Sequence, residues 1–275
     1  MSDMMPIKDI AGLSEPITKL IETVSSAIGT LYEPKKIRLR ARAEAEASII
    51  QAEAEAEKKT IEYFASERIK YLELRRQQNI EKITNIAENQ LPEEVSTQKV
   101  DEDWIIQFFN IAQDVSSEEL QMIWGKLLAG EVTKPGSFSL LTINLVKMIS
   151  QDDAIKFKKL CNYVWGDRFI LGYYLMHDYF TKEGLSWDIM NSFETLGLIN
   201  FKIGWTRESN TTLTLQYFGD SYNITNLASY SNRLEGLGLS FAGRELFSIC
   251  DRKPDYEYLL SMIDKYSDRK FTFQS

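Results

Sequence analysis

The segment between Pro34 and Pro92 constrains the fold of this chain most strongly, because it contains neither glycine nor proline. Its residues are mostly Ala, Glu, Lys, Arg, Gln, Ile and Leu, which are mainly good helix formers. Proline suits the first turn of a helix and the residues just past its end, so the two prolines fit the two boundaries. About 56 helical residues would extend roughly 84 Å at 1.5 Å per residue. The sequence therefore predicts one long helix over residues 34–92.

Apolar residues in this segment recur at steps of four, four and three, which is an eleven-residue period interrupted only by Lys58 and Arg76. Eleven residues in three turns favour straight parallel or mildly right-handed packing over a left-handed heptad coil. We expect this stripe to join copies of the chain in a parallel homo-oligomer, from dimer to tetramer. The predicted oligomerisation residues are Leu39, Ala43, Ala47, Ile50, Ala54, Ile61, Ala65, Ile69, Leu72, Ile80, Ile83, Ala87 and Leu91.

The alternative interpretation is a solvated helix held by charge pairs, or one that lies on the C-terminal half of its own chain. Helices of globular proteins average about 11 to 12 residues. A much longer helix rarely finds enough of its own chain to cover its apolar stripe. Self-association is therefore the favoured hypothesis.

Residues 1–33 are predicted to contain a short amphipathic helix, because apolar residues between Leu13 and Leu31 follow helical spacing. Five basic residues come directly after it. They are Lys35, Lys36, Arg38, Arg40 and Arg42. An apolar helix beside a basic cluster fits contact with an anionic membrane. The polar face of this helix is not a row of lysines, so packing of its apolar face against the oligomer's own long helix is the favoured interpretation.

Residues 93–183 predict a helical domain with recognisable helix starts. Asp101 or Asp103 can cap the first helix, and Ser116 with Glu119 forms the sequence pattern of a capping box for the next. Gly130 is predicted to end that second helix. A further helix is predicted to start at Ser150.

The segment PGSFS, which lies between the second of these helices and Ser150, is interpreted as a turn rather than as a nucleophile or phosphate loop. Pro135 and Gly136 fit the centre of a type II turn. A nucleophilic serine needs a base, and the chain's only histidine, His177, has no spacing relation to a partner. Cys161 and Cys250 are interpreted as core or surface residues, without a metal-binding motif. We expect no catalytic residue, cofactor or metal.

Residues 184–275 predict a small α+β unit. A helix capped by Ser186 and ended by Gly197 is followed by strands near 201–205 and 210–218, expected to pair as a hairpin, and by a helix after residue 240. This order is typical of a winged helix, a fold that often binds DNA. The first of these helices has no Lys or Arg, and residues 96–275 contain 18 basic and 23 acidic residues, a balance of −5. Phosphate contacts need cations, so protein contact is favoured over nucleic acid.

The whole chain has a net charge of −8, only two cysteines and no run of eighteen apolar residues. We therefore expect a cytoplasmic protein, with peripheral contact to the inner membrane as the open alternative. The predicted fold is mainly α, with a long N-terminal coiled-coil helix, a helical middle domain and a winged-helix-like C-terminal unit. The predicted divisions are 1–33, 34–92, 93–183 and 184–275.

The chain resembles, in the order and the amino-acid sequence of several segments, the bacterial family called domain of unknown function 2806. The segments are chiefly DEDWIIQFFNIAQDVSSEELQMIWGKLLAGEVTKPGSFSLLT and LSFAGRELFSI. That resemblance covers nearly the whole chain and implies bacterial origin and frequent company with prophages and mobile elements. It assigns no catalytic residues. The resulting hypothesis is a non-enzymatic homo-oligomer that contacts another protein, plausibly in phage defence. The alternatives are a DNA-binding regulator that uses the C-terminal unit and a peripheral membrane effector that uses residues 7–42.

Overall fold

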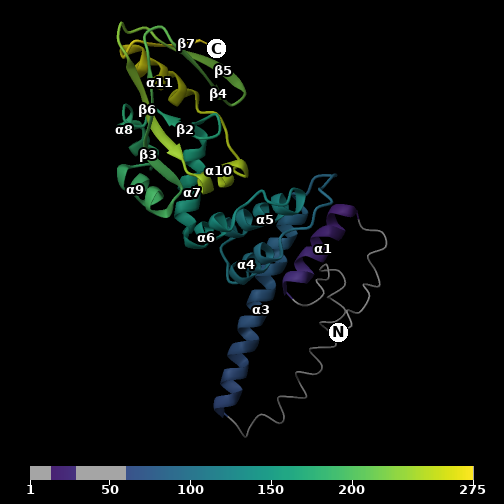
Figure 1. Cartoon of the computed structure of the whole chain (residues 1–275). Coiled ribbons are helices and arrows are strands. Elements are labelled where there is room, and N and C mark those ends of the chain that lie inside the picture. The colour runs from purple at the N-terminus through teal and green to yellow at the C-terminus, as the bar shows by residue number, and fades with distance from the viewer. Residues whose placement is uncertain (1–13, 29–59, 275) are drawn as a thin grey trace. The chain divides into compact units, whose positions relative to one another are not determined.

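A computed structural model describes residues 14–28 and 60–274 of the chain (Figure 1). The chain divides into two compact units, residues 1–140 and 141–275. The boundary falls inside the predicted helical domain 93–183, and the described part of the predicted long helix belongs to the first unit. The division differs from the predicted one because the long helix packs against the helices that follow it, while later helices of the predicted middle domain accompany a sheet in the second unit.

The first unit is helical. Its described helices are α1 (Glu15–Ile28), α3 (Thr60–Glu88), α4 (Glu102–Ala112) and α5 (Glu118–Thr133). Helix α3 is continuous over its 29 residues and ends just before Pro92. Of the predicted helix over 34–92, residues 34–59 lie outside the described part.

Helix α4 begins where the sequence predicts, because the Asp101 carboxylate accepts a hydrogen bond from the Trp104 backbone N–H at 2.9 Å. The predicted start of α5 is wrong. Its N-cap is Ser117, and the Ser116 hydroxyl instead accepts a hydrogen bond from the Asn79 side chain at 3.2 Å. The capping box predicted for Ser116 therefore does not form.

Glycines in α5 mark close packing rather than the end of the helix. The helix runs through Gly130 to Thr133, so the predicted stop at Gly130 is wrong. A Cβ atom at Gly130 would lie 2.6 Å from the Phe138 ring, and one at Gly125 would lie 2.3 Å from Ile86 Cγ2 of α3. The missing side chains let α5 lie directly against its neighbours.

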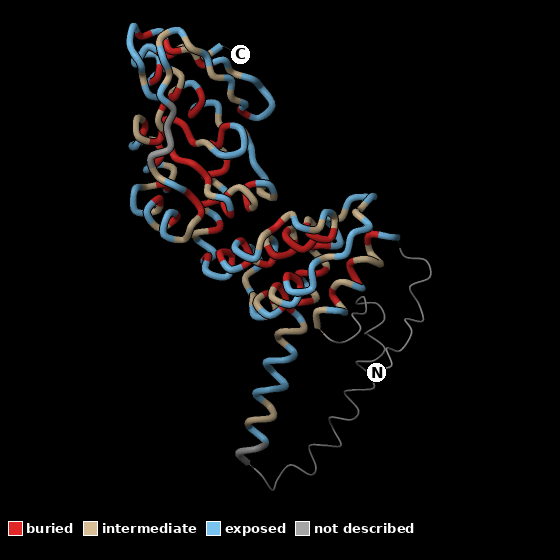
Figure 2. Tube along the Cα trace, in the orientation of Figure 1, coloured by how far each residue is buried: buried red, intermediate tan, exposed pale blue. Residues whose placement is uncertain are grey.

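The core of the first unit forms where α3, α4 and α5 meet. Ile83 of α3 and Phe108 of α4 are fully buried, as is Trp124 of α5. The Phe108 and Trp124 rings contact edge to face at 5.0 Å between centroids. Figure 2 shows the buried residues of this unit concentrated in these helices.

Helix α1 covers part of this core. Leu20, Ile21 and Val24 on its apolar face are at most 3% exposed, and the helix packs chiefly against α4 and α5. The Lys19 ammonium donates to the backbone carbonyls of Ser96 at 2.6 Å and Val132 at 2.7 Å. The apolar face is thus core, but it packs against the bundle of its own chain and not chiefly against the long helix as predicted.

The second unit combines helices with two antiparallel sheets. Its helices are α6 (Leu140–Met148, which begins at the unit boundary), α7 (Gln151–Leu160), the 3-10 helix η2 (Cys161–Tyr163), α8 (His177–Lys182), α9 (Trp187–Leu196), α10 (Phe241–Ser248) and α11 (Tyr256–Asp268). Its strands are β1 (Val164–Trp165), β2 (Phe169–Leu171), β3 (Ile199–Arg207), β4 (Thr212–Tyr217), β5 (Asp220–Asn226), β6 (Asn232–Leu239) and β7 (Phe271–Gln274). One sheet has the order β1-β2-β6-β3 and the other β4-β5-β7.

The strand pairing differs from the predicted hairpin. Strand β3 pairs with β6, whereas β4 pairs with β5 across a two-residue turn. The turn residues Phe218 and Gly219 both have positive φ, 49° and 95°, which suits the tight connection of a twisted hairpin. In sequence, the β4–β5 hairpin therefore lies between β3 and β6, which pair with each other in the other sheet.

Several predicted features of local structure are confirmed. Ser150 and Asp153 form a capping box at the start of α7. Gly197 ends α9 in the left-handed conformation with φ of 83°. In the PGSFS segment, Gly136 has φ of 84° and the Ser137 N–H donates to the Lys134 carbonyl at 3.2 Å, as in a type II turn.

Candidate functional site

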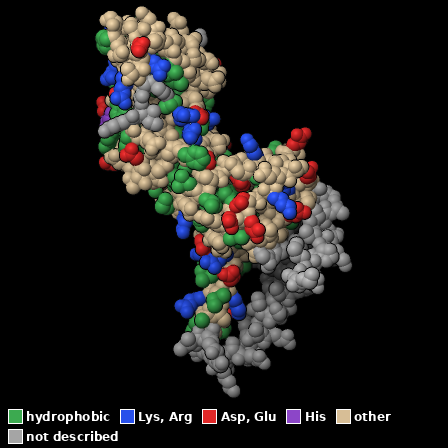
Figure 3. Space-filling view, viewed as in Figure 1, with side chains coloured by type: hydrophobic (Ala, Val, Ile, Leu, Met, Phe, Trp, Pro, Cys, Tyr) green, Lys and Arg blue, Asp and Glu red, His purple; other side chains and the backbone are tan. Residues whose placement is uncertain are grey.

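The N-terminal part of α3 extends beyond its own helical bundle (Figure 1). We call residues 63–74 the projecting segment. Its large apolar side chains are exposed: Phe64 by 60%, Ile69 by 61%, Tyr71 by 68% and Leu74 by 52%. Figure 3 shows hydrophobic side chains among charged ones along this part of α3. Several large apolar side chains exposed on one segment mark an interaction site more often than a single exposed leucine does.

The exposed stripe continues the face that forms the core farther along the helix. Ile69 and Leu72 stand one eleven-residue repeat before Ile80 and Ile83, and this spacing places them on the same side of a helix. Ile80 and Ile83 are at most 6% exposed, whereas Leu72 is 39% exposed. One continuous stripe therefore passes from a covered to an uncovered environment.

A second group of apolar side chains lies on another side of the projecting segment. Phe64, Tyr71 and Leu74 recur at steps of seven and three residues, which keeps them on one helix face. The Tyr63 and Phe64 rings contact edge to face at 5.6 Å between centroids. Charged residues stand among these side chains, including Glu67, which lies on the face of Phe64 and Tyr71 and forms an ion pair with Lys70 at 2.7 Å. Apolar side chains are therefore exposed on more than one side of the projecting segment.

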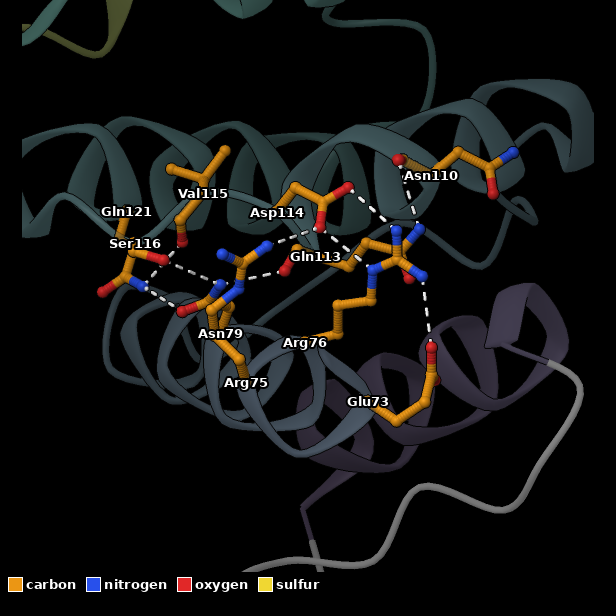
Figure 4. Close-up of polar contacts among 10 residues, drawn as sticks. All are labelled: Glu73, Arg75, Arg76, Asn79, Asn110, Gln113, Asp114, Val115, Ser116 and Gln121. Carbon is orange, nitrogen blue, oxygen red and sulfur yellow. Dashed lines mark hydrogen bonds and ion pairs between the residues drawn. The ribbon is translucent and has the colours of Figure 1, made fainter. Parts of the chain in front are cut away.

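A polar cluster holds α3 at the point where it leaves the bundle (Figure 4). Arg76 donates from Nε and Nη2 to the two oxygens of Asp114, at 3.0 and 3.3 Å. Arg75 donates to Oδ1 of the same carboxylate at 3.3 Å. The hydrogen bond from Arg76 is the main cause that lowers the pKa of Asp114 below its usual value near 3.8, and Asp114 in turn raises the pKa of Arg76. The carboxylate thus bridges two successive arginines of α3.

Next to this bridge lies a more deeply buried amide network. The Asn79 side-chain amide donates to the Gln113 carbonyl at 2.9 Å. The Asn79 side-chain oxygen accepts a hydrogen bond from the Gln121 side-chain amide at 3.1 Å. The same Gln121 amide also donates to the Val115 carbonyl at 2.8 Å. Asn79 and Gln121 are at most 4% exposed. Because these buried amides have partners, the network fixes α3 against the α4–α5 connection and sets the direction of the projecting segment.

A family model described as a protein of unknown function, DUF2806, matches residues 64–263. The chain belongs to the DUF2806 family. The matched part of this DUF2806 chain starts within the projecting segment and ends within α11. Searches of curated proteins and of solved structures returned no match.

The structure divides the predicted oligomerisation residues of this DUF2806 protein into three groups. The first group, which lies outside the described part, is Leu39, Ala43, Ala47, Ile50 and Ala54. The basic residues predicted for contact with an anionic membrane also lie outside it: Lys35, Lys36, Arg38, Arg40 and Arg42. Those in or beside the projecting segment are Ile61, whose side chain is not described, Ala65, Ile69 and Leu72. The third group is Ile80, Ile83, Ala87 and Leu91.

The prediction that Ile80, Ile83 and Ala87 contact sister chains is wrong. They are at most 6% exposed, and α3 packs there against α4 and α5 of the same chain. Leu91 lies past the end of α3 and is half-buried. Periodicity alone could not reveal this change of partner. The sequence signal for this change is Arg76. It interrupts the apolar stripe and binds Asp114 at the point where α3 leaves the bundle.

Two other polar clusters have structural roles. The buried Glu131 carboxylate accepts hydrogen bonds from the backbone N–H groups of Gly136 at 2.6 Å and Phe138 at 3.0 Å, which stabilises the PGSFS turn. In the second unit, Asp255 caps α11 by accepting from the Tyr258 N–H at 2.9 Å, and it also accepts from the Tyr179 hydroxyl at 2.8 Å. Burial is the main cause that raises the pKa of both tyrosines.

Within residues 14–28 and 60–274, no group of three or more His, Cys, Asp or Glu side chains is placed to hold a metal ion. His177 starts α8 with a half-exposed side chain, 4.0 Å from the Asp178 carboxylate. No helix of the described part is both long and apolar enough to cross a membrane.

Proposed function

We propose that this DUF2806 protein is a non-enzymatic homo-oligomer whose copies associate in parallel along α3. The observation that carries the proposal is the exposure of Ile69 and Leu72 on the face that becomes core at Ile80 and Ile83. A stripe that is buried at one end of a helix and exposed at the other needs a second cover at the exposed end. Another copy presents the same stripe, and the half-buried, small Ala65 allows two backbones to approach closely.

The energies indicate how much helix the association needs. Full burial of a Leu or Ile side chain stabilises by about 1.5–3 kcal/mol. Because Ile69 and Leu72 are already partly covered, the four such side chains of two chains would contribute roughly 3–6 kcal/mol. The loss of translational and rotational freedom costs about 4–15 kcal/mol. This gain reaches only the lower end of that cost, so the continuation of the stripe predicted for residues 39–61 would have to supply the rest of the stability.

The second unit is proposed to present a surface to another protein. The proposed comparison is with a winged helix, to which α7, β2, α8, α9, β3 and β6 would correspond in this order. Here η2 and β1 precede β2 and the β4–β5 hairpin lies between β3 and β6, while β2, β6 and β3 are neighbours in the sheet. In that arrangement α9 would be the helix that reads DNA. It carries Asp188 and Glu194 and no Lys or Arg, so it lacks the cations that phosphate contact requires. Retention of a fluorescent DNA duplex at low salt would favour the DNA-binding regulator instead.

The membrane effector is less well supported, because the apolar face of α1 is covered by α4 and α5. Its residues would have to leave the core before they could enter a membrane interface. The company of prophages and mobile elements that the family resemblance implies makes phage defence the proposed setting. A phage challenge of cells that carry the intact gene or the Ile69→Asp variant tests that setting.

Light scattering of the purified chain tests the oligomer. At micromolar concentration we expect two to four times the chain mass, and Ile69→Asp combined with Leu72→Asp should return a single chain mass. Gln78→Asp is the control for each single aspartate, because it adds one negative charge on an exposed side of α3 away from the stripe. A wild-type chain that scatters as a monomer, or a double variant that keeps the oligomeric mass, would remove the proposal.

A further inference from the structure

The only two cysteines of the chain meet in the second unit. Cys161 begins the 3-10 helix η2 and is fully buried, and Cys250 lies two residues past the end of α10 and is half-buried. Their thiols are within hydrogen-bonding contact. Because the two residues are far apart in sequence, the fold and not local geometry brings them together.

Contacts beside the pair join the two segments. The Asn162 side-chain oxygen accepts a hydrogen bond from the Lys253 backbone N–H at 3.0 Å. Lys158 and Asp251 form an ion pair at 3.7 Å. Each contact joins an immediate or near neighbour of Cys161 to a neighbour of Cys250. Two contacts between the same two segments therefore lie next to the cysteine pair.

The two thiols differ in what can reach them. Burial, followed by the hydrogen bond with Cys250, raises the pKa of the Cys161 thiol well above its usual value, while the charge of Arg252 acts in the opposite direction. The Arg252 guanidinium lies 3.9 Å from the centre of the Phe247 ring, which keeps its charge beside the pair. Cys161 stays a buried thiol at neutral pH, whereas the half-buried Cys250 is the sulfur that a small oxidant can reach.

We propose that Cys250 and Cys161 form a redox modification site, in which a peroxide oxidises Cys250 and Cys161 then closes a reversible disulfide. In the first step the Cys250 sulfur attacks the peroxide, which gives a sulfenic acid and one molecule of water. In the second, the Cys161 sulfur displaces that hydroxyl, which leaves as a second water while the S–S bond forms. Two thiols lose two electrons in total, and the peroxide takes them up.

The disulfide would stabilise the second unit. It would join η2 to the end of α10 and close a long loop that contains strands β1 to β6. A cross-link of this kind restricts the unfolded chain. In proteins of reducing compartments such bonds are usually transient and redox-sensing. This inference is independent of the proposed oligomer.

The test treats the intact chain with hydrogen peroxide and compares it with Cys161→Ser and Cys250→Ser. In the wild type we expect loss of both free thiols, a proteolytic peptide that links Cys161 to Cys250, and reversal by dithiothreitol. The thermal midpoint of the second unit should rise by roughly 5–10 °C. Cys161→Ser should instead accumulate a sulfenic acid at Cys250 that dimedone labels, and Cys250→Ser should keep its remaining thiol.

Circular dichroism of the reduced variants shows whether they fold, and Cys161→Ala serves where the serine disturbs the buried position. Wild-type chain that keeps two titratable thiols in excess peroxide would overturn the proposal. So would oxidation of Cys250 to the sulfinic acid without the linked peptide, or a disulfide that forms only between chains.

Discussion

The two halves of helix α3 carry the same apolar repeat but have opposite surroundings. Around Ile80 and Ile83 the repeat lies against α4 and α5, and around Ile69 and Leu72 it is exposed. The change occurs at Arg75, Arg76 and Asn79, which hold the helix to the α4–α5 connection. A periodic apolar stripe thus specifies which face of a helix needs to be buried. Whether that face is buried by the same chain depends on where the other helices of the chain pack.

The largest effect is expected from a charge in the covered half. Ile83→Asp places a carboxylate at a fully buried position and should lower the free energy of unfolding of the first unit by about 4 kcal/mol or more. Hydrogen exchange of the buried backbone amides of α4 and α5 over a urea series measures it. Ile83→Val, as the conservative control, should cost about 1 kcal/mol. A wild-type urea midpoint for Ile83→Asp would break the distinction between the halves.

The same charge in the projecting half should act on association and not on folding. Ile69→Asp should weaken self-association about 100-fold, which is roughly 2.7 kcal/mol, and change the free energy of unfolding of the isolated chain by less than about 0.5 kcal/mol. Sedimentation over a dilution series measures the first value and urea unfolding the second. Tyr71→Asp, on the other face, should weaken association less. A reversed order would move the interface to the face of Phe64 and Tyr71.

A smaller effect is expected where α5 approaches α3 most closely. Gly125→Ala places a Cβ atom 2.3 Å from Ile86 Cγ2 and 3.2 Å from the Ile83 carbonyl oxygen. Overpacking of this kind should destabilise the first unit by about 1–3 kcal/mol in a thermal or urea melt. Ser66→Ala, in the projecting segment, is the control and should leave the unfolding midpoint unchanged. Equal midpoints for both variants would contradict the close packing.

The smallest effect is expected from Asp114→Asn. The arginines lower the pKa of this carboxylate in the folded chain, so its contribution is present above the unfolded pKa near 3.8 and is lost as pH falls through the lower folded pKa. The side chain is 45% exposed, and solvent screening limits the difference in thermal midpoint to about 2 °C. Melts should separate the variant from wild type at pH 6 and not near pH 2. A separation that persists at low pH would contradict the ionic origin.

Local signals predicted much of the structure. The caps at Asp101 and at Ser150, the turn at Gly136 and the stop at Gly197 depend on backbone chemistry within a few residues, so the sequence was sufficient. Pairing across distance was not predictable in this way. The Phe218–Gly219 turn pairs β4 with β5, which leaves β3 to pair with β6. The hydrogen bonds of Asn79 and Asp114 likewise join residues more than thirty positions apart.

The candidate site shows the same limit. Ile69 and Leu72 were singled out by their spacing, whereas the exposed Phe64, Tyr71 and Leu74 on the other face of the projecting segment were missed, because they do not follow the eleven-residue repeat. The burial of Ile80, Ile83 and Ala87 by α4 and α5 was missed, because helices from elsewhere in the chain supply their contacts. The cysteine pair was missed for the same reason.

Photo-crosslinking from position 69 tests the central claim most directly. Chains that carry p-benzoylphenylalanine in place of Ile69 would be mixed with isotopically heavy chains, irradiated, digested and analysed by mass spectrometry. The account predicts hybrid peptides that join position 69 of one chain to residues 61–76 of another. If the label at position 69 reacts but its crosslinks stay within single chains, the proposed association along α3 is contradicted.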